Sequence, residues 1–442
     1  MPLPLKPLAL SLAVALSVTL PHLSTAQQIG SPENRPSLST YHCTTAHGCT
    51  RQNTTVVLDA ATHPIHNPTT NQSCTTPSNT LNPVLCPDKQ TCASNCVIEG
   101  ISNYAAYGVT TQGSKLTLQQ YLNENGTLNA VSPRVYLVSE SENYETLHLL
   151  NQEFTFDVDV SQLPCGMNGA LYLSEMHADG GRSPLNPAGS AYGTGYCDAQ
   201  CYVTPWINGE ANTENHGSCC NEMDIWEANS RATGLTPHAC LYDGGGLHEC
   251  TSDEECNGPT GENDSVCDKW GCSFNPYALG RKDYYGLELT VDTTKPFTVV
   301  TQFITDDGTA MGTLNEIRRL YIQNNRLIKN AVISIPPSSN SSETTNALSD
   351  AVCDATTNWF GRFGGMDGMG QALGRGMVLA MSIWNDAGGY MQWLDGGDAG
   401  PCNATEGAPA VIEQTTPGTR VVFGGIRWGD LGSTFGVKRG RE

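Results

Sequence analysis

Eighteen cysteines constrain this 442-residue chain more than any other feature of its sequence. Their number is even, their spacing is irregular, and no twin CxxC pair of the zinc-ribbon kind is present. In a secreted chain such a set predicts a disulfide framework rather than free or metal-bound thiols. We therefore expect a fold whose long loops are held by disulfide bridges.

The N-terminus has the three parts of a secretory signal peptide. Lys6 supplies the positive charge, Leu8–Leu20 an apolar run too short to span a bilayer, and Ser24–Ala26 a cleavage site. We expect residues 1–26 to be removed and the mature protein, starting at Gln27, to be secreted and extracellular. Asn-x-Ser/Thr sequons that fit surface glycosylation occur at Asn53, Asn71, Asn125, Asn263, Asn340 and Asn403.

Charge excludes several kinds of partner. Asp plus Glu (44) outnumber Lys plus Arg (23), and the net charge is −21. Such a surface repels phosphate backbones and anionic membranes, so we expect neither nucleic acid nor a membrane as a partner. A neutral ligand is compatible with this charge. The hydrophobic fraction, 38%, is enough for a packed core.

Alternation of apolar and polar residues predicts a fold rich in β-strands. The expected strands are Arg134–Ser139, Glu153–Val160, Ala170–Met176, Phe297–Phe303, Arg319–Gln323, Gly376–Trp384 and Arg420–Trp428. Short helices are expected near Leu116–Asn123, Ala347–Thr356 and Met366–Leu373, and disulfide-stapled loops over Leu38–Cys96. Many short strands with few helices predict a β-sandwich. No linker or internal repeat divides the chain, so we expect one domain over 27–442.

The segment Gly217–Asn229 (GSCCNEMDIWEAN) places three carboxylates among apolar residues. Like charges and burial both disfavour ionisation, and a fold keeps such a costly cluster for function more often than for stability. On a regular strand Glu222 and Asp224 face one side and Glu227 the other. A β-bulge at Ile225–Trp226 would bring all three to one face.

This cluster predicts acid–base chemistry. The Cα atoms of Glu222 and Glu227 would be about 13 Å apart, and their side chains could lean together to the ~5.5 Å of a retaining glycosidase. Two other interpretations are a calcium site and a solvated acidic edge. The alternation with Met, Ile and Trp disfavours a solvated edge, and the Gly and Asn residues of a calcium loop are missing between the carboxylates.

The carboxylate segment resembles the E-x-D-x-x-E signature of glycoside hydrolase family 7, the family of fungal cellulases. The resemblance extends from about Tyr41 to Gly432. It includes Phe156–Tyr172 (FDVDVSQLPCGMNGALY), Tyr192–Cys201 (YGTGYCDAQC), Leu235–Cys240 (LTPHAC), Phe274–Gly280 (FNPYALG) and Ser382–Asp395 (SIWNDAGGYMQWLD). It implies an all-β fold, a curved antiparallel β-sandwich of the concanavalin-like jelly-roll kind, with disulfide-stapled loops around a substrate cleft.

The resemblance also implies a role for each matching residue. Glu222 would be the nucleophile, Glu227 the acid/base, and Asp224 would share a hydrogen bond with Glu222. Trp384 and Trp393 match tryptophans that stack on sugar rings on either side of the cleavage point. Polar residues near the reacting sugar are matched by Tyr172, Asp198 and Gln200, and one on the leaving-group side by His238. The implied partner is a β-1,4-glucan, with a monomeric enzyme and no metal or cofactor.

Departures from the family pattern favour the endoglucanase branch, whose cleft is open. Asn208–Ser218 and the segment between Trp393 and Cys402 (LDGGDAGP) are short where cellobiohydrolases have long loops that roof a tunnel. Product-site arginines have no counterpart in Asn263–Cys267, Gly396–Cys402 or at Ala278, and Asp59–His66 replaces a Trp-rich stretch. Little follows Trp428, so we expect no appended carbohydrate-binding module.

By the same resemblance the cysteines pair as 43–49, 74–96, 86–92, 165–402, 197–220, 201–219, 240–267, 250–256 and 272–353. Bridges 197–220 and 201–219 would hold the backbone just before Glu222. The expected function is a secreted, retaining endo-β-1,4-glucanase. The alternatives are a cellobiohydrolase of the same family, a lectin-like sandwich that binds glucan without cutting it, and a disulfide-rich wall protein.

Overall fold

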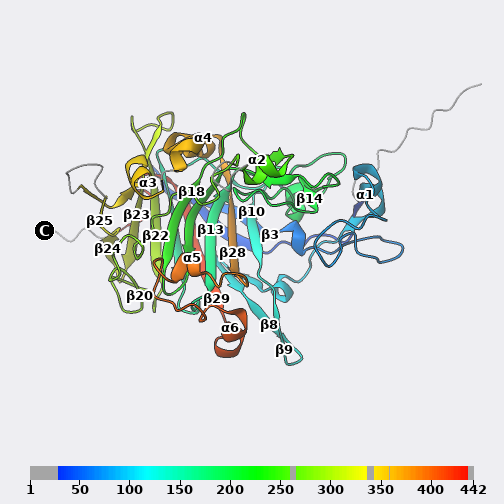
Figure 1. Ribbon diagram of the computed structural model, residues 1–442, viewed down its shortest axis with the longest axis horizontal. Helices are drawn as coiled ribbons and strands as arrows, with labels where there is room; N and C mark the ends of the chain where they lie inside the picture. The colour runs from blue at the N-terminus through cyan, green and yellow to red at the C-terminus, as the bar shows by residue number, and fades with distance from the viewer. Residues whose placement is uncertain (1–27, 259–264, 336–342, 358, 437–442) are drawn as a thin grey trace, which may run out of the picture.

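The computed structural model describes residues 28–258, 265–335, 343–357 and 359–436 (Figure 1). The expected signal peptide and the sequons at Asn263 and Asn340 lie outside these ranges. Within them, no helix is long and apolar enough to cross a bilayer.

Twelve strands form one continuous path of hydrogen-bonded neighbours that folds into two layers. In spatial order the first layer contains β18 (Thr233–His238), β17 (Glu222–Ala228), β13 (Met167–Ser174), β28 (Met377–Asn385), β10 (Arg134–Val138) and β3 (Gly48–Leu58). The path continues through β2 (Ser37–Thr44), β29 (Arg420–Asp430), β12 (Gln152–Asp159), β22 (Phe297–Thr305), β23 (Leu314–Gln323) and β24 (Arg326–Lys329). All neighbours on this path are antiparallel except β2 and β29.

The main core lies between the two layers, where period-two alternation turns one face of each strand inward. Trp226 of β17 is fully buried there, with its ring 5.9 Å from that of Phe156 on β12 and 5.8 Å from that of Phe297 on β22. Such edge-to-face contacts add to the hydrophobic stabilisation of the buried rings. The expected β-sandwich is therefore confirmed.

Helices are short and lie at the edges of the sandwich: α1 (Lys89–Asn95), α2 (Asp253–Asn257), α3 (Asp350–Thr356), α4 (Gly365–Arg375), α5 (Gln392–Asp395) and α6 (Pro409–Thr415). Figure 1 shows α3 and α4 at one end of the strands, and α6 with the hairpin of β8 (Tyr121–Glu124) and β9 (Thr127–Ala130) at the other. The disulfide-rich loops around α1 extend to one side.

Two of the sequence expectations are wrong in part. Leu116–Asn123 is not a helix but strand β7 (Lys115–Gln119) and the start of β8, because Leu116 and Leu118 alternate with polar residues and β7 pairs with β29. The segment expected as loops from Leu38 begins with strands β2 and β3. Their Ser, Thr and Asn residues hid the strand pattern, although Leu38, Val56 and Leu58 are fully buried.

The other secondary-structure predictions are confirmed within a few residues. The helix expected at Met366–Leu373 lies inside α4, whereas that at Ala347–Thr356 begins only at Asp350, because Ala347–Leu348 pairs with β23. All nine disulfides join the cysteines that the family resemblance pairs. Cys43 and Cys49 are direct partners across the β2–β3 hairpin.

Candidate active site

A β-bulge in β17 brings the three carboxylates to one face of the first layer, as the spacing predicts. The register of β17 against β18 shifts between Asp224 and Glu227. Ile225 and Trp226 both point into the core as a result. Glu222, Asp224 and Glu227 all line a cleft on the opposite face.

Arg319 holds the bulge from the core side. It lies on β23, in the facing layer, and is only 3% exposed. Its guanidinium donates to the carbonyl of Ile225 and, through Nε, to Thr301 Oγ1 at 3.2 Å, and it lies 5.7 Å from the ring centroid of Trp226. Sequence reasoning missed this residue, because the alternation over Arg319–Gln323 would turn Leu320 and Ile322 inward, whereas in the structure Arg319 is on the inward face.

The cleft has a volume of about 950 Å³ and runs across the strands of the first layer. All nine residues singled out from the sequence line it: Tyr172, Asp198, Gln200, Glu222, Asp224, Glu227, His238, Trp384 and Trp393. The rings of Trp384 and Trp393 are nearly parallel, with centroids 6.2 Å apart. Trp393 is 47% exposed, so this rim of the cleft is open to solvent.

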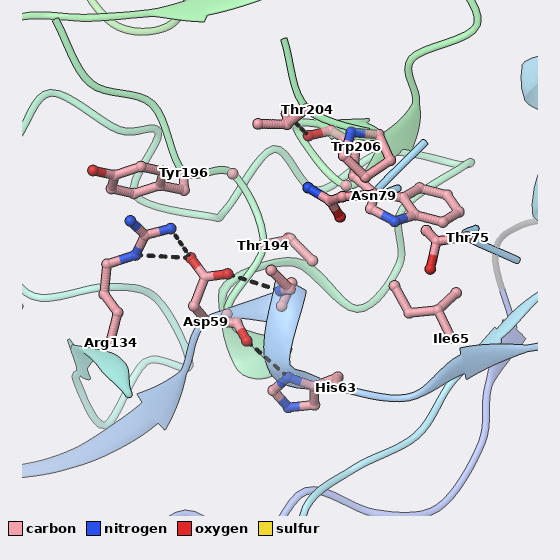
Figure 2. A pocket seen from close by; sticks show the side chains of 16 residues that line it. Asp59, His63, Ile65, Thr75, Asn79, Arg134, Thr194, Tyr196, Thr204 and Trp206 are labelled. Atoms are coloured by element: carbon pink, nitrogen blue, oxygen red, sulfur yellow. Dashed lines mark hydrogen bonds and ion pairs between the residues drawn. The ribbon is translucent and has the colours of Figure 1, made fainter. Parts of the chain in front are cut away.

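Several residues of the cleft were not foreseen. The guanidinium of Arg134 lies 3.4 Å from the ring centroid of Tyr196 and pairs with Asp59 at 2.8 Å. Figure 2 shows this pair among the residues of a smaller pocket, which shares Asp59, Arg134, Tyr196 and Thr204 with the main cleft and is also lined by Trp206. Arg134 is the first residue of the expected strand Arg134–Ser139, and nothing else in the sequence indicated that it lines the cleft. Thr236, Lys269, Trp270, Ser273 and Ser382 also line the main cleft.

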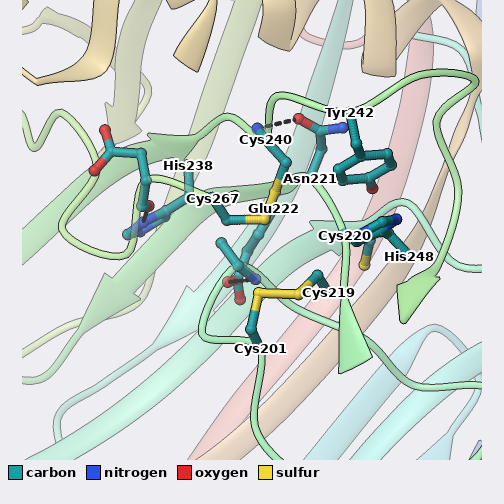
Figure 3. Close-up of a disulfide and its surroundings, with 12 residues drawn as sticks. Cys201, Cys219, Cys220, Asn221, Glu222, His238, Cys240, Tyr242, His248 and Cys267 are labelled. Carbon is teal, nitrogen blue, oxygen red and sulfur yellow. Dashed lines mark hydrogen bonds between the residues drawn. A yellow bond between two sulfur atoms is a disulfide. The ribbon is translucent and has the colours of Figure 1, made fainter. Parts of the chain in front are cut away.

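Two disulfides fix the backbone that meets Glu222. Cys197–Cys220 and Cys201–Cys219 join the segment 197–201 to the residues just before β17. Figure 3 shows the Cys201–Cys219 bridge near Glu222. In this arrangement the N–H of Ala199 donates to Glu222 Oε2 at 3.1 Å. The clamp expected from the sequence is therefore present, and it includes a backbone donor aimed at the carboxylate.

The electrostatics of the cluster set limits on its ionisation. Burial raises the pKa of Glu222 well above its usual range, and the charges of Asp224 and Asp198 raise it further. Burial and then Asp198 raise the pKa of Asp224 in the same way. Since each negative charge disfavours the next, the cluster retains protons at a pH where free carboxylates have lost them.

Glu227 has its own environment. Desolvation, followed by the charge of Asp224, raises the pKa of Glu227 to about 8, against the smaller opposing effects of His238 and of the hydrogen bond from Asn168. Asn168 Nδ2 donates to Glu227 Oε1 at 2.8 Å, and its own Oδ1 accepts from the N–H of Ala228 at 3.1 Å. Glu227 is therefore a protonated acid, held in one orientation, at neutral pH.

His238 shares a proton with Asp224. Its Nδ1 lies 2.8 Å from the carbonyl oxygen of Asp268, which can only accept, so Nδ1 carries a hydrogen. Its Nε2 lies 3.0 Å from Asp224 Oδ2. This second contact needs a hydrogen on one of the two side chains, so Asp224 and His238 hold each other in one orientation.

A curved β-sandwich whose cleft combines buried carboxylates of unequal pKa with tryptophan rings is the architecture of a carbohydrate-active enzyme. Comparison with known proteins identifies the family. The model of glycosyl hydrolase family 7 matches residues 28–435. The chain therefore belongs to glycosyl hydrolase family 7, as the sequence resemblance predicts.

The similar proteins include both endoglucanases and a cellobiohydrolase. An endo-beta-1,4-glucanase, celB, of Emericella nidulans is 66% identical over 96% of this chain and 99% of its own. The native structure of the Humicola insolens endocellulase EGI has a TM-score of 0.85 and 48% identity, covering 92% of this chain and all of that one. A family 7 cellobiohydrolase from Daphnia pulex has a TM-score of 0.84 and 37% identity, covering 92% and 99%.

Proposed function

We propose that the protein is a secreted endo-β-1,4-glucanase that hydrolyses internal bonds of cellulose and related β-glucans with retention of configuration. The observation that carries this proposal is the bulge in β17, which gives Glu222, Asp224 and Glu227 a common face in an aromatic-lined cleft. The celB name of the 66% identical relative supports the same activity. A glucan chain is neutral, which suits the net charge of −21.

In the first step Glu222 acts as the nucleophile. Its carboxylate oxygen forms a bond to the anomeric carbon while the glycosidic C–O bond breaks, and Glu227 gives its proton to the departing oxygen. A pKa of about 8 keeps that proton on Glu227 at neutral pH. His238 and the N–H of Ala199 both lower the pKa of Glu222 and so favour its ionised form, against burial and the charges of Asp224 and Asp198.

In the second step water replaces the leaving group. Glu227, now a carboxylate, takes a proton from the water as its oxygen bonds to the anomeric carbon, and the bond to Glu222 breaks. Glu227 regains its proton, and two inversions at one carbon give net retention. We assign Asp224 to orienting Glu222, and His238 to orienting Asp224.

The remaining residues of the cleft bind sugar. Trp384 and Trp393 offer flat apolar faces that suit the C–H face of a β-glucosyl ring. Tyr172, Asp198 and Gln200 supply hydroxyl, carboxylate and amide groups for sugar hydroxyls. These groups suffice for binding and proton transfer, so the mechanism uses no cofactor or metal, and we expect the enzyme to act as a monomer.

The variants Glu222→Gln and Glu227→Gln test these roles. Glu222→Gln should abolish turnover of a soluble β-glucan while leaving the fold unchanged. Glu227→Gln should still react with an aryl glycoside whose leaving group needs little protonation, so a glycosyl-enzyme should accumulate and be visible by intact mass. Substantial turnover by Glu222→Gln, or no adduct with Glu227→Gln, would contradict the assignment.

The mode of attack is tested separately from the chemistry. Cleavage within chains is favoured by the exposed rim at Trp393 and by the short segments Asn208–Ser218 and 394–401. The viscosity of carboxymethyl-cellulose should therefore fall sharply while few reducing ends are released. A slow fall in viscosity with cellobiose as the first main product would instead indicate a cellobiohydrolase.

A further inference from the structure

Trp270 is an exposed tryptophan in the cleft that the mechanism above does not use. All seven tryptophans lie in the described part of the chain, and only Trp270 (60%) and Trp393 (47%) are exposed. Both line the cleft. An indole left in water forgoes the stabilisation that burial would give, so its exposure at a binding cleft points to a ligand rather than to folding.

The loop that carries Trp270 is held rigidly. It spans only the four residues 268–271 between Cys267 and Cys272, and these cysteines are bonded to Cys240 and Cys353. Within the loop, Asp268 Oδ1 accepts from the N–H of Trp270 at 3.2 Å and from the next N–H at 2.9 Å. A ring on such a loop is positioned before any ligand arrives, which lowers the entropic cost of binding.

Two residues of the candidate active site hold the same loop. His238 Nδ1 donates to the carbonyl of Asp268 at 2.8 Å, and Gln200 Nε2 donates to the carbonyl of Lys269 at 2.8 Å. Gly271, at φ +64°, lies so close to β18 that a Cβ there would be 2.7 Å from His238 Cε1. The loop therefore packs directly on the outer side of β18.

This packing gives the cleft an order along its length. Arg134 on β10 lies toward one end, and the carboxylates of β17, His238 on β18 and then Trp270 follow in that order. Neighbouring strands are about 4.8 Å apart, close to the advance of a β-1,4-glucan per sugar unit. With cleavage over β17, one sugar would lie over β18 and the next against Trp270.

We propose that Trp270 is a stacking platform for the second sugar of the leaving group. This inference rests on the proposed function, because Glu227 as the acid and His238 on the leaving-group side define that direction. The indole face would cover the C–H face of a neutral glucosyl unit. Asn275 Nδ2, three residues after Cys272, donates to the carbonyl of Leu394 at 3.2 Å and so ties this wall to the helix that carries Trp393.

The test compares two substrates in four proteins: the wild type, Trp270→Ala, Trp270→Tyr, and the control Leu241→Ala. Leu241 is 65% exposed but does not line the cleft. Cellotetraose cleaved at its central bond places two sugars on the leaving-group side, whereas an aryl β-cellobioside places only the aryl group there. We expect kcat/KM of Trp270→Ala to fall about tenfold on cellotetraose, which corresponds to ~1.4 kcal/mol, and to stay within about twofold on the aryl glycoside.

The controls separate this role from others. Trp270→Tyr should recover most of the activity on cellotetraose, and Leu241→Ala should match the wild type on both substrates. An unchanged kcat/KM of Trp270→Ala on cellotetraose, an equal loss on both substrates, or the same selective loss in Leu241→Ala would each overturn the inference. A wild type inactive on both substrates would instead refute the proposed function.

Discussion

Because Glu227 keeps its proton in the folded protein, the folded state should lose stability as the pH rises. Replacing Glu227 with glutamine should remove this loss. The folded carboxyl keeps its proton up to a pKa of about 8, whereas the usual value is 4.5. The folded state thus binds one more proton than the unfolded state between these values. Stability therefore falls with pH across this window, the reverse of the behaviour of a salt-bridged carboxylate.

The size of the effect follows from the width of the window. At pH 7 the pH lies about 2.5 units above the pKa of the unfolded carboxyl, and each unit corresponds to ~1.36 kcal/mol. Keeping the proton on folding therefore lowers the free energy of unfolding by about 3.4 kcal/mol. Because Glu227 is partly exposed to the cleft, solvent screening reduces this to about 2 kcal/mol. Glu227→Gln does not titrate, so its melting temperature should exceed that of the wild type by about 2–4 °C at pH 7.5.

Calorimetric melting of the wild type and Glu227→Gln at pH 4.5, 6 and 7.5 measures this difference. The gap should be small at pH 4.5 and should widen at each step. Glu254→Gln, at an exposed residue of α2, serves as the matched control and should follow the wild type throughout. A gap that stays constant with pH, or a variant less stable than the wild type at pH 7.5, would refute the reasoning.

Three further predictions concern the surroundings of the carboxylates. Arg319→Met leaves the carbonyl of Ile225 without its buried donor, so kcat on a soluble glucan should fall at least about tenfold with KM within about twofold; an unchanged kcat would exclude a positioning role. Asp224→Asn removes a charge that raises the pKa of Glu227, so the basic limb of the kcat/KM profile should move to lower pH, and a shift upward would contradict this. Treatment with a chelator should leave the initial rate unchanged, since the proposed chemistry uses only side chains; a loss restored by a divalent metal would show otherwise.

Strand positions could be predicted wherever one face is buried and the other is polar. Glu153–Val160 shows that alternation clearly and matches β12, whereas Gly376–Trp384, which matches β28, is an apolar run because both of its faces are buried. Strands β2 and β3 were missed because Thr40 and Thr54 are buried and hydrogen-bonded to each other, at 3.1 Å, where an apolar pair would be expected. The strand propensity of single residues does not show which residues pair across strands, so it could not predict this contact.

The catalytic residues of the candidate site could be predicted from the sequence, but the residues that hold them in place could not. The spacing of Glu222, Asp224 and Glu227 allows few geometries on a strand, so the bulge could be inferred. Arg319 could not be assigned, because its partner at Ile225 is 94 residues away in sequence and lies in the other layer. The same holds for Trp270, whose place in the cleft depends on hydrogen bonds from two separate segments.

The bulge determines both which residues of β17 enter the core and which face the cleft. Two consecutive inward residues, Ile225 and Trp226, fill the space between the layers, and only that doubling returns Glu227 to the face of Glu222. Deleting either inward residue would leave a regular strand without a bulge, so Glu227 would keep its face but lie one position nearer to Glu222, and one of the two inward side chains would be lost. Because Trp226 also contacts aromatic rings of both β12 and β22, the core resists any shift of register. The spacing E-x-D-x-x-E is thus a packing requirement as well as a catalytic one, which explains how six residues can specify both the fold of this edge and its function.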